Sequence, residues 1–151
     1  VELTVAGETH ARDLQVIEDP RLGVSIAERA NWTESLFTIA GLWDDALRGA
    51  RVALPAHWAA SHLSETHDLP KRELDELAET HRLYTELLSR VRSLYGQVGG
   101  WTGPMTADQE SQFAFYSETV ATLESRVMRL RDEWLPRINR KLPRSQRITL
   151  N

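Results

Sequence analysis

The sequence predicts a mainly α-helical fold, an antiparallel up-down-up bundle of three long helices with an N-terminal β-hairpin. Apolar residues recur at alternating steps of three and four in three long segments, which is the spacing of one helix face. Two short sequences, at residues 25–28 and 106–109, fit the capping box found at helix starts. Short connections between the segments favour antiparallel neighbours. With 151 residues, the chain has room for a hairpin over residues 1–18 and one helical domain over residues 22–151.

The N-terminal segment alternates apolar and polar residues, as a β-hairpin does. Its first strand would carry Leu3 and Val5 and its second Leu14 and Val16, with a turn near Gly7. Two strands alone are marginally stable in water, and an unpaired edge invites pairing. We therefore expect self-association through the hairpin edge, or pairing with strands outside this chain. The first residue, a valine within a strand-like run, suggests a processed product or a fragment of a longer protein.

The first helix is expected to begin at the capping box of Ser25 and Glu28, and to stop where Gly49 and Pro55 weaken it. Residues 56–67 fit either a short helix or an irregular crossover. The apolar face of this helix is defined by Trp32, Leu36, Ile39, Trp43, Ala46 and Ala50.

The second helix is expected to follow a cap at Asp68 and to end at Gly99 and Gly100. The third begins at the capping box of Thr106 and Gln109, and Pro136 is expected to kink its last turns. The second apolar face consists of Leu74, Leu77, His81, Tyr84, Leu88, Val91, Tyr95 and Val98. The third consists of Phe113, Tyr116, Val120, Leu123, Val127, Leu130, Trp134 and Ile138.

Charge is concentrated near the C-terminus. Residues 126–147 hold eight Arg or Lys and two acidic residues, although the whole chain has a net charge of −4. An antiparallel bundle would place these cations beside the acidic start of the second helix, with Glu76 level with Arg129, Glu79 with Arg126, and Glu73 with residues 131–132. No nucleic-acid partner is expected, because no recognisable motif accompanies the basic residues.

The sequence predicts no catalytic residue, cofactor or metal. Cysteine is absent, which excludes thiol nucleophiles and Cys-ligated metals. No carboxylate lies three residues before any of four histidines, as a di-metal bundle would need; these are His57, His62, His67 and His81. The acidic pairs at residues 44–45 and 132–133 diverge on a helix, so they favour solvated faces over glycoside hydrolysis. No segment approaches the roughly 18 apolar residues of a membrane span.

Two tryptophans fall in expected connections between helices. Trp58 and Trp101 could cover the ends of the bundle, which is the favoured interpretation, or could form a sugar-stacking or partner-binding surface. With the basic residues Arg137, Arg140 and Lys141, they make up the candidate ligand or partner surface. Trp32, Trp43 and Trp134 lie on apolar faces and are expected in the core.

Five short stretches carry a family resemblance. They are the hairpin with Asp19-Pro20-Arg21, then Ser93-Leu-Tyr-Gly96, Pro104-Met-Thr106-Ala-Asp-Gln109, Leu135-Pro-Arg-Ile-Asn139 and Leu142-Pro143. In this order they resemble the C-terminal region of bacterial sortilin-like β-propeller proteins with bacterial neuraminidase (BNR) repeats, often classed as glycosyl hydrolases. Residues 51–70 depart from that pattern.

The resemblance implies that the hairpin is the remnant of a β-sandwich and that the helices form an appended bundle. It implies an exported, extracytoplasmic protein whose β-propeller and β-sandwich domains are the partners of this chain. We therefore expect a non-catalytic helical accessory or interaction module. The alternative is a carbohydrate-binding or glycoside-hydrolysing unit that uses Trp58, Trp101 and nearby carboxylates.

Overall fold

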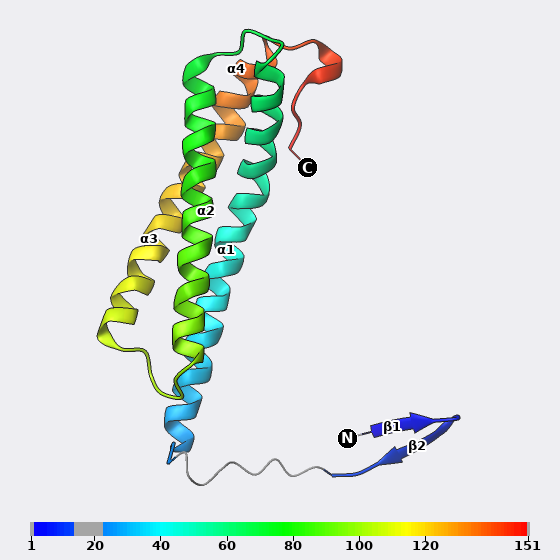
Figure 1. Cartoon of the computed structure of the whole chain (residues 1–151), viewed down its shortest axis with the longest axis vertical. Helices are drawn as coiled ribbons and strands as arrows, with labels where there is room; N and C mark the ends of the chain where they lie inside the picture. The colour runs from blue at the N-terminus through cyan, green and yellow to red at the C-terminus, as the bar shows by residue number, and fades with distance from the viewer. Residues whose placement is uncertain (1, 14–22, 151) are drawn as a thin grey trace.

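The computed structural model describes residues 2–13 and 23–150, and its fold is an antiparallel bundle of three long helices with a two-stranded hairpin (Figure 1). The predicted fold class is confirmed. Helix α1 (Ile26–Ser64) runs up, α2 (Lys71–Gly99) runs down beside it, and α3 (Ala107–Arg129) runs up again. The chain then continues through a π turn η2 (Leu130–Trp134), a short helix α4 (Leu135–Asn139) and a 3-10 turn η3 (Arg144–Gln146).

The connection between the two strands of the hairpin is shorter than the alternation of apolar and polar residues predicted. Strand β1 (Glu2–Val5) pairs antiparallel with β2 (Glu8–Ala11), so that Val5 lies opposite Glu8. The two-residue turn between them has positive φ angles of 51° at Ala6 and 87° at Gly7. A turn of this handedness matches the twist of paired strands and fixes their register. The strand that pairs with β1 thus comes earlier in the chain than Leu14 and Val16, which were expected to form it and lie outside the described part of the chain.

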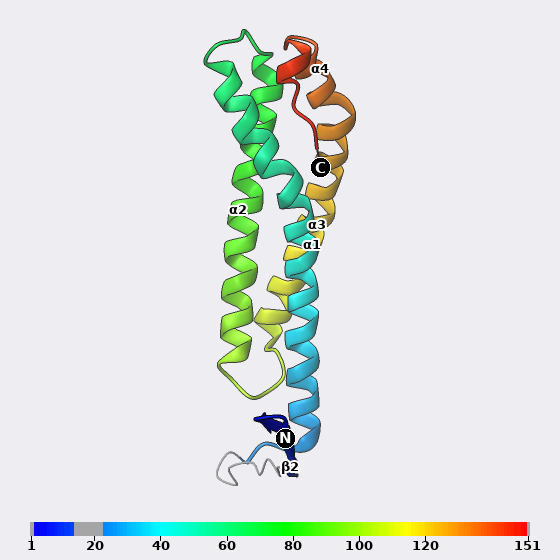
Figure 2. The same ribbon diagram turned by 90° about the vertical axis from the view of Figure 1, so that its right-hand side faces the viewer.

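Helix α1 begins as predicted and ends later than predicted. The backbone N–H of Glu28 donates to Ser25 Oγ at 3.2 Å, and the N–H of Ser25 donates to the Glu28 carboxylate at 2.8 Å. Pro55 does not stop the helix, which continues to Ser64. Residues 56–64 are therefore part of α1, and they form neither a separate short helix nor an irregular crossover. Alanines on both sides of the proline are fully buried, so the packing of this segment outweighs one lost backbone hydrogen bond. Figure 2 shows the axis of α1 bending in its upper half.

Two of the three predicted ends of the other long helices are confirmed. Thr106 and Gln109 form the capping box of α3, and α2 ends at Gly99. The exception is Asp68, since Pro70 is the residue that caps α2 and no side chain donates or accepts there. Near Pro136 the expected kink takes the form of the π turn η2, after which the proline stands in the first turn of α4.

The core lies where the three helices meet. Helix α1 contributes small buried residues at close spacing, and Gly49 sits directly against the ring of Tyr84 from α2. Burial, and then the charge of Glu124, raise the pKa of Tyr84 to about 12. Trp134 is buried as expected, whereas Trp32 is half-buried and its indole N–H donates to the Val98 carbonyl oxygen at 2.8 Å.

Ion pairs join α2 to α3 and to α4, although their partners differ from the predicted ones. Arg126 of α3 was expected level with Glu79. It contacts the Glu76 carboxylate at 2.8 Å and donates to Thr80 Oγ at 3.0 Å, whereas Arg129 was expected opposite Glu76. Arg137 contacts Glu73 at 2.9 Å. Glu73 was expected opposite residues 131–132, so its partner lies five or six residues farther along the chain than predicted. The antiparallel topology itself matches the prediction.

Candidate functional site

The structure separates the two tryptophans of the candidate surface. Trp58 lies in α1 and contacts the ring of His81, and Trp101 follows the last residue of α2. Eighteen helical residues separate His81 from Gly99, which corresponds to about 27 Å along α2. The side chains are 66% and 72% exposed, so the prediction that they cover the bundle ends is wrong. Because of the separation along α2, the two tryptophans cannot line a single pocket.

Trp58 belongs instead to a cluster with two histidines. The rings of His57 in α1 and His81 in α2 have centroids 4.6 Å apart, and Trp58 meets His81 edge-on at 5.8 Å. Burial, and then the charge of His81, lower the pKa of His57 below its usual 6.5. No group of three or more His, Cys, Asp or Glu side chains suited to a metal ion occurs among the described residues. The cluster is therefore an aromatic contact between the two helices.

The three basic residues of the candidate surface have different surroundings. Arg137 is held by Glu73, whose hydrogen bond raises the pKa of the guanidinium and lowers that of the carboxyl. Glu73 is only 5% exposed, so this arginine neutralises a buried charge. Arg140 donates to the Pro136 carbonyl oxygen at 3.3 Å, and Lys141 is exposed. Arg137 thus has a structural role, whereas Arg140 and Lys141 are exposed cations.

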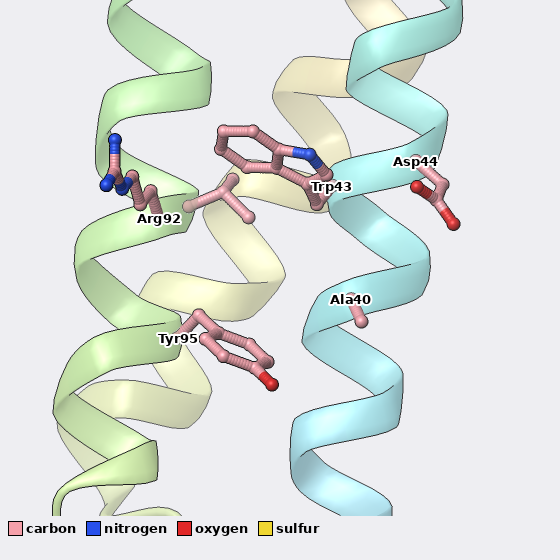
Figure 3. Close-up of a pocket in the computed structure, with 6 residues that line it drawn as sticks. Ala40, Trp43, Asp44, Arg92 and Tyr95 are labelled. Atoms are coloured by element: carbon pink, nitrogen blue, oxygen red, sulfur yellow. The ribbon is translucent and has the colours of Figure 1, made fainter.

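A groove that the sequence did not predict lies between α1 and α2 (Figure 3). It has a volume of about 340 Å³, and its floor is built from Ala40 and Trp43 of α1 with Val91 and Tyr95 of α2. Asp44 and Arg92 stand on its two rims. Figure 3 shows α3 behind the two helices, so the groove opens on the side of the bundle that α3 does not cover.

The groove belongs to a longer apolar row that the spacing of α2 could have revealed. The predicted apolar face of α2 divides into two rows. Leu77, Tyr84, Val91 and Val98 are buried, whereas the other four residues are half-buried or exposed. These four, spaced by seven residues each, are Leu74, His81, Leu88 and Tyr95. A seven-residue repeat of this kind is typical of a seam that receives another helix.

Two carboxylates line a second hollow, between α1 and α3. They are Asp45 and Glu124, and apolar and small residues line the hollow with them. Asp45 already pairs with Arg48 on the same helix. A glycosidase needs two carboxyl groups on either side of one bond, one of them protonated. This hollow is the best available place to test the hydrolytic alternative.

Comparisons with known proteins give no match. No family model, no curated protein and no solved structure matches the chain significantly. None of the helices in the described part combines the length and apolarity that crossing a bilayer requires.

Proposed function

We propose that the chain is a non-catalytic helical accessory module that mediates contacts between protein domains. The observation that carries the proposal is the exposure of the hairpin. The side chains of Glu2 and of residues 4–13 are all exposed. Because two strands alone are marginally stable in water, a hairpin without a packed face needs strands or surfaces from elsewhere. The bundle, in contrast, buries a continuous core of its own.

The resemblance supplies the identity of the proposed partners. They are the β-sandwich and β-propeller domains of a larger exported protein related to glycosyl hydrolases, with the hairpin completing the sandwich. A free strand edge would also allow two copies to pair through their hairpins. Both modes use the backbone hydrogen-bonding groups on the outer edges of β1 and β2.

The main rival is a carbohydrate-binding or hydrolytic unit, and a direct assay separates the two. The full chain is screened against chromogenic glycosides and a glycan array. We expect neither turnover nor binding. Turnover that disappears in Glu124→Gln or Asp45→Asn, but persists in the matched surface variant Glu118→Gln, would overturn the proposal. Glycan binding that is lost in Trp58→Ala or Trp101→Ala would overturn it as well.

A further inference from the structure

We infer that the α1–α2 face opposite α3 is a self-association surface that receives a second copy of this chain. This face is separate from the hairpin, and it does not depend on the proposed domain partners. It contains the groove, the half-buried row of α2 and, farther along α1, Leu54 and Trp58.

The face is apolar along most of its length. Tyr95 is 45% exposed and Trp58 is 66% exposed, and Leu54, Leu74 and Leu88 are half-buried against the core. Exposed apolar side chains on one face are typical of an interaction site. In a three-helix bundle, the open seam between two antiparallel helices is also where a four-helix bundle places its remaining helices.

The size of the face fits a protein interface. The row from Leu74 to Tyr95 spans 21 residues of helix, or about 30 Å. Two helices with axes about 10 Å apart therefore present roughly 600 Å² over that length. Standard interfaces bury about 800 Å² on each partner, and side chains that project from the face supply part of the difference.

The charges at the groove favour a second copy over an unrelated helix. Asp44 and Arg92 are exposed on opposite rims at the same level of the bundle. A two-fold axis parallel to the bundle would lay α1 of one copy antiparallel to α2 of the other. Asp44 of each copy would then lie beside Arg92 of the other, which gives two equivalent ion pairs. A surface that is self-complementary in this way meets the requirement of an isologous dimer.

Charge reversal tests this arrangement on the full chain, by sedimentation equilibrium over a range of concentrations. The wild type should dimerise, and Asp44→Arg or Arg92→Asp alone should weaken dimerisation by roughly tenfold, since each change acts at two contacts. The double variant should recover most of the loss. Glu118→Arg, an exposed reversal on α3, is the matched control and should leave the association unchanged.

Disulfide trapping tests the orientation of the two copies independently. The chain contains no cysteine, so a mixture of Asp44→Cys and Arg92→Cys chains should form mixed disulfide dimers that neither variant forms well alone. A chain that stays monomeric at every concentration overturns the inference. So does a dimer that survives both reversals but disappears when residues 1–18 are deleted, because its contact would then lie on the hairpin edge.

Discussion

The hairpin and the bundle differ in the surroundings of their side chains. The bundle closes both capping boxes, buries a continuous apolar core and pairs the buried carboxylate of Glu73 with Arg137. The hairpin has a backbone ladder between β1 and β2, a contact between the hydroxyls of Thr4 and Thr9 at 3.1 Å, and a contact between His10 and Glu8 at 3.9 Å. Its described side chains are otherwise exposed to water.

This difference assigns the stability of the fold to the bundle and the binding of partners to the hairpin. A three-helix unit with its own core can fold by itself, whereas a two-stranded hairpin gains most from a partner. We therefore expect changes in the bundle core to alter stability strongly, and changes in the hairpin to alter association alone.

The largest effect is expected from Gly49→Ala in α1. A Cβ at this position would collide with the phenol ring of Tyr84, which is fully buried and has little room to move. Overpacking of a rigid core typically costs about 3 kcal/mol when the backbone must shift. The free energy of unfolding, measured by urea titration, should fall by that amount.

Gly41→Ala is the matched control for this substitution. Gly41 lies in the same helix, is exposed, and has open space where a Cβ would stand. Alanine is the better helix former by about 1 kcal/mol, so this variant should be more stable than the wild type. Equal effects of the two substitutions would show that α1 and α2 do not approach closely at Gly49.

The next largest effect is expected from Arg137→Ala. Removing the arginine leaves the Glu73 carboxylate buried without its partner, although the solvent-exposed side of the pair moderates the cost. We expect a loss of about 2 kcal/mol in the free energy of unfolding. Lys141→Ala, a nearby exposed cation, should change it little. If both variants behave alike, the candidate surface is only a solvated basic patch and Arg137 has no structural role.

Much of the bundle could be predicted because its signals are local. The capping boxes at Ser25 and Thr106 involve residues three apart, and the apolar spacing of each helix depends on the helix alone. The length of α1 could not be predicted in this way. A proline at position 55 argues for a break, and only tertiary packing of the alanines around it keeps the helix continuous.

The candidate surface was harder to predict, since it depends on which helix faces meet. Trp58 and Trp101 looked equivalent in the sequence, but Trp58 lies beside His81 within α2 and Trp101 lies beyond the C-terminal end of that helix. The groove beside Trp43 arises from the relative rotation of α1 and α2. No spacing within one helix encodes that rotation, although the seven-residue row on α2 indicates that a second face exists.

A smaller effect is expected from pH, through His57. Its folded-state pKa is lowered by burial and then by His81, so the unfolded chain binds the proton more tightly. Stability is therefore full above the unfolded pKa of about 6.5 and is lost as pH falls below it, toward the lower folded pKa. The midpoint temperature of thermal unfolding should therefore decrease as the pH is lowered from about 7.5 to about 5.5. This range spans the unfolded pKa of about 6.5.

His57→Gln should remove most of that dependence, and His62→Gln should preserve it. His62 is an exposed histidine on the same helix, which makes it the suitable control. An unchanged pH slope in His57→Gln would show that the two stacked imidazoles do not affect folding.

The smallest effect is expected from deleting residues 1–18. The helical circular dichroism and the unfolding midpoint should both stay close to those of the full chain, because no described hairpin side chain is buried. Association through the hairpin edge, detected by light scattering, should be reduced. Loss of the helical signal on deletion would make the hairpin part of the bundle core.

Amide hydrogen exchange on the intact chain tests the independence of the two regions most directly. Amides of residues 2–11 should exchange at nearly the rate of an unstructured peptide, because a solitary hairpin opens readily. Amides near Leu77, Tyr84 and Val91 in the core of α2 should exchange only through global unfolding. Equal, strong protection of both regions in the monomeric chain would contradict the proposal, since the hairpin would then be held by the bundle rather than free to bind another domain.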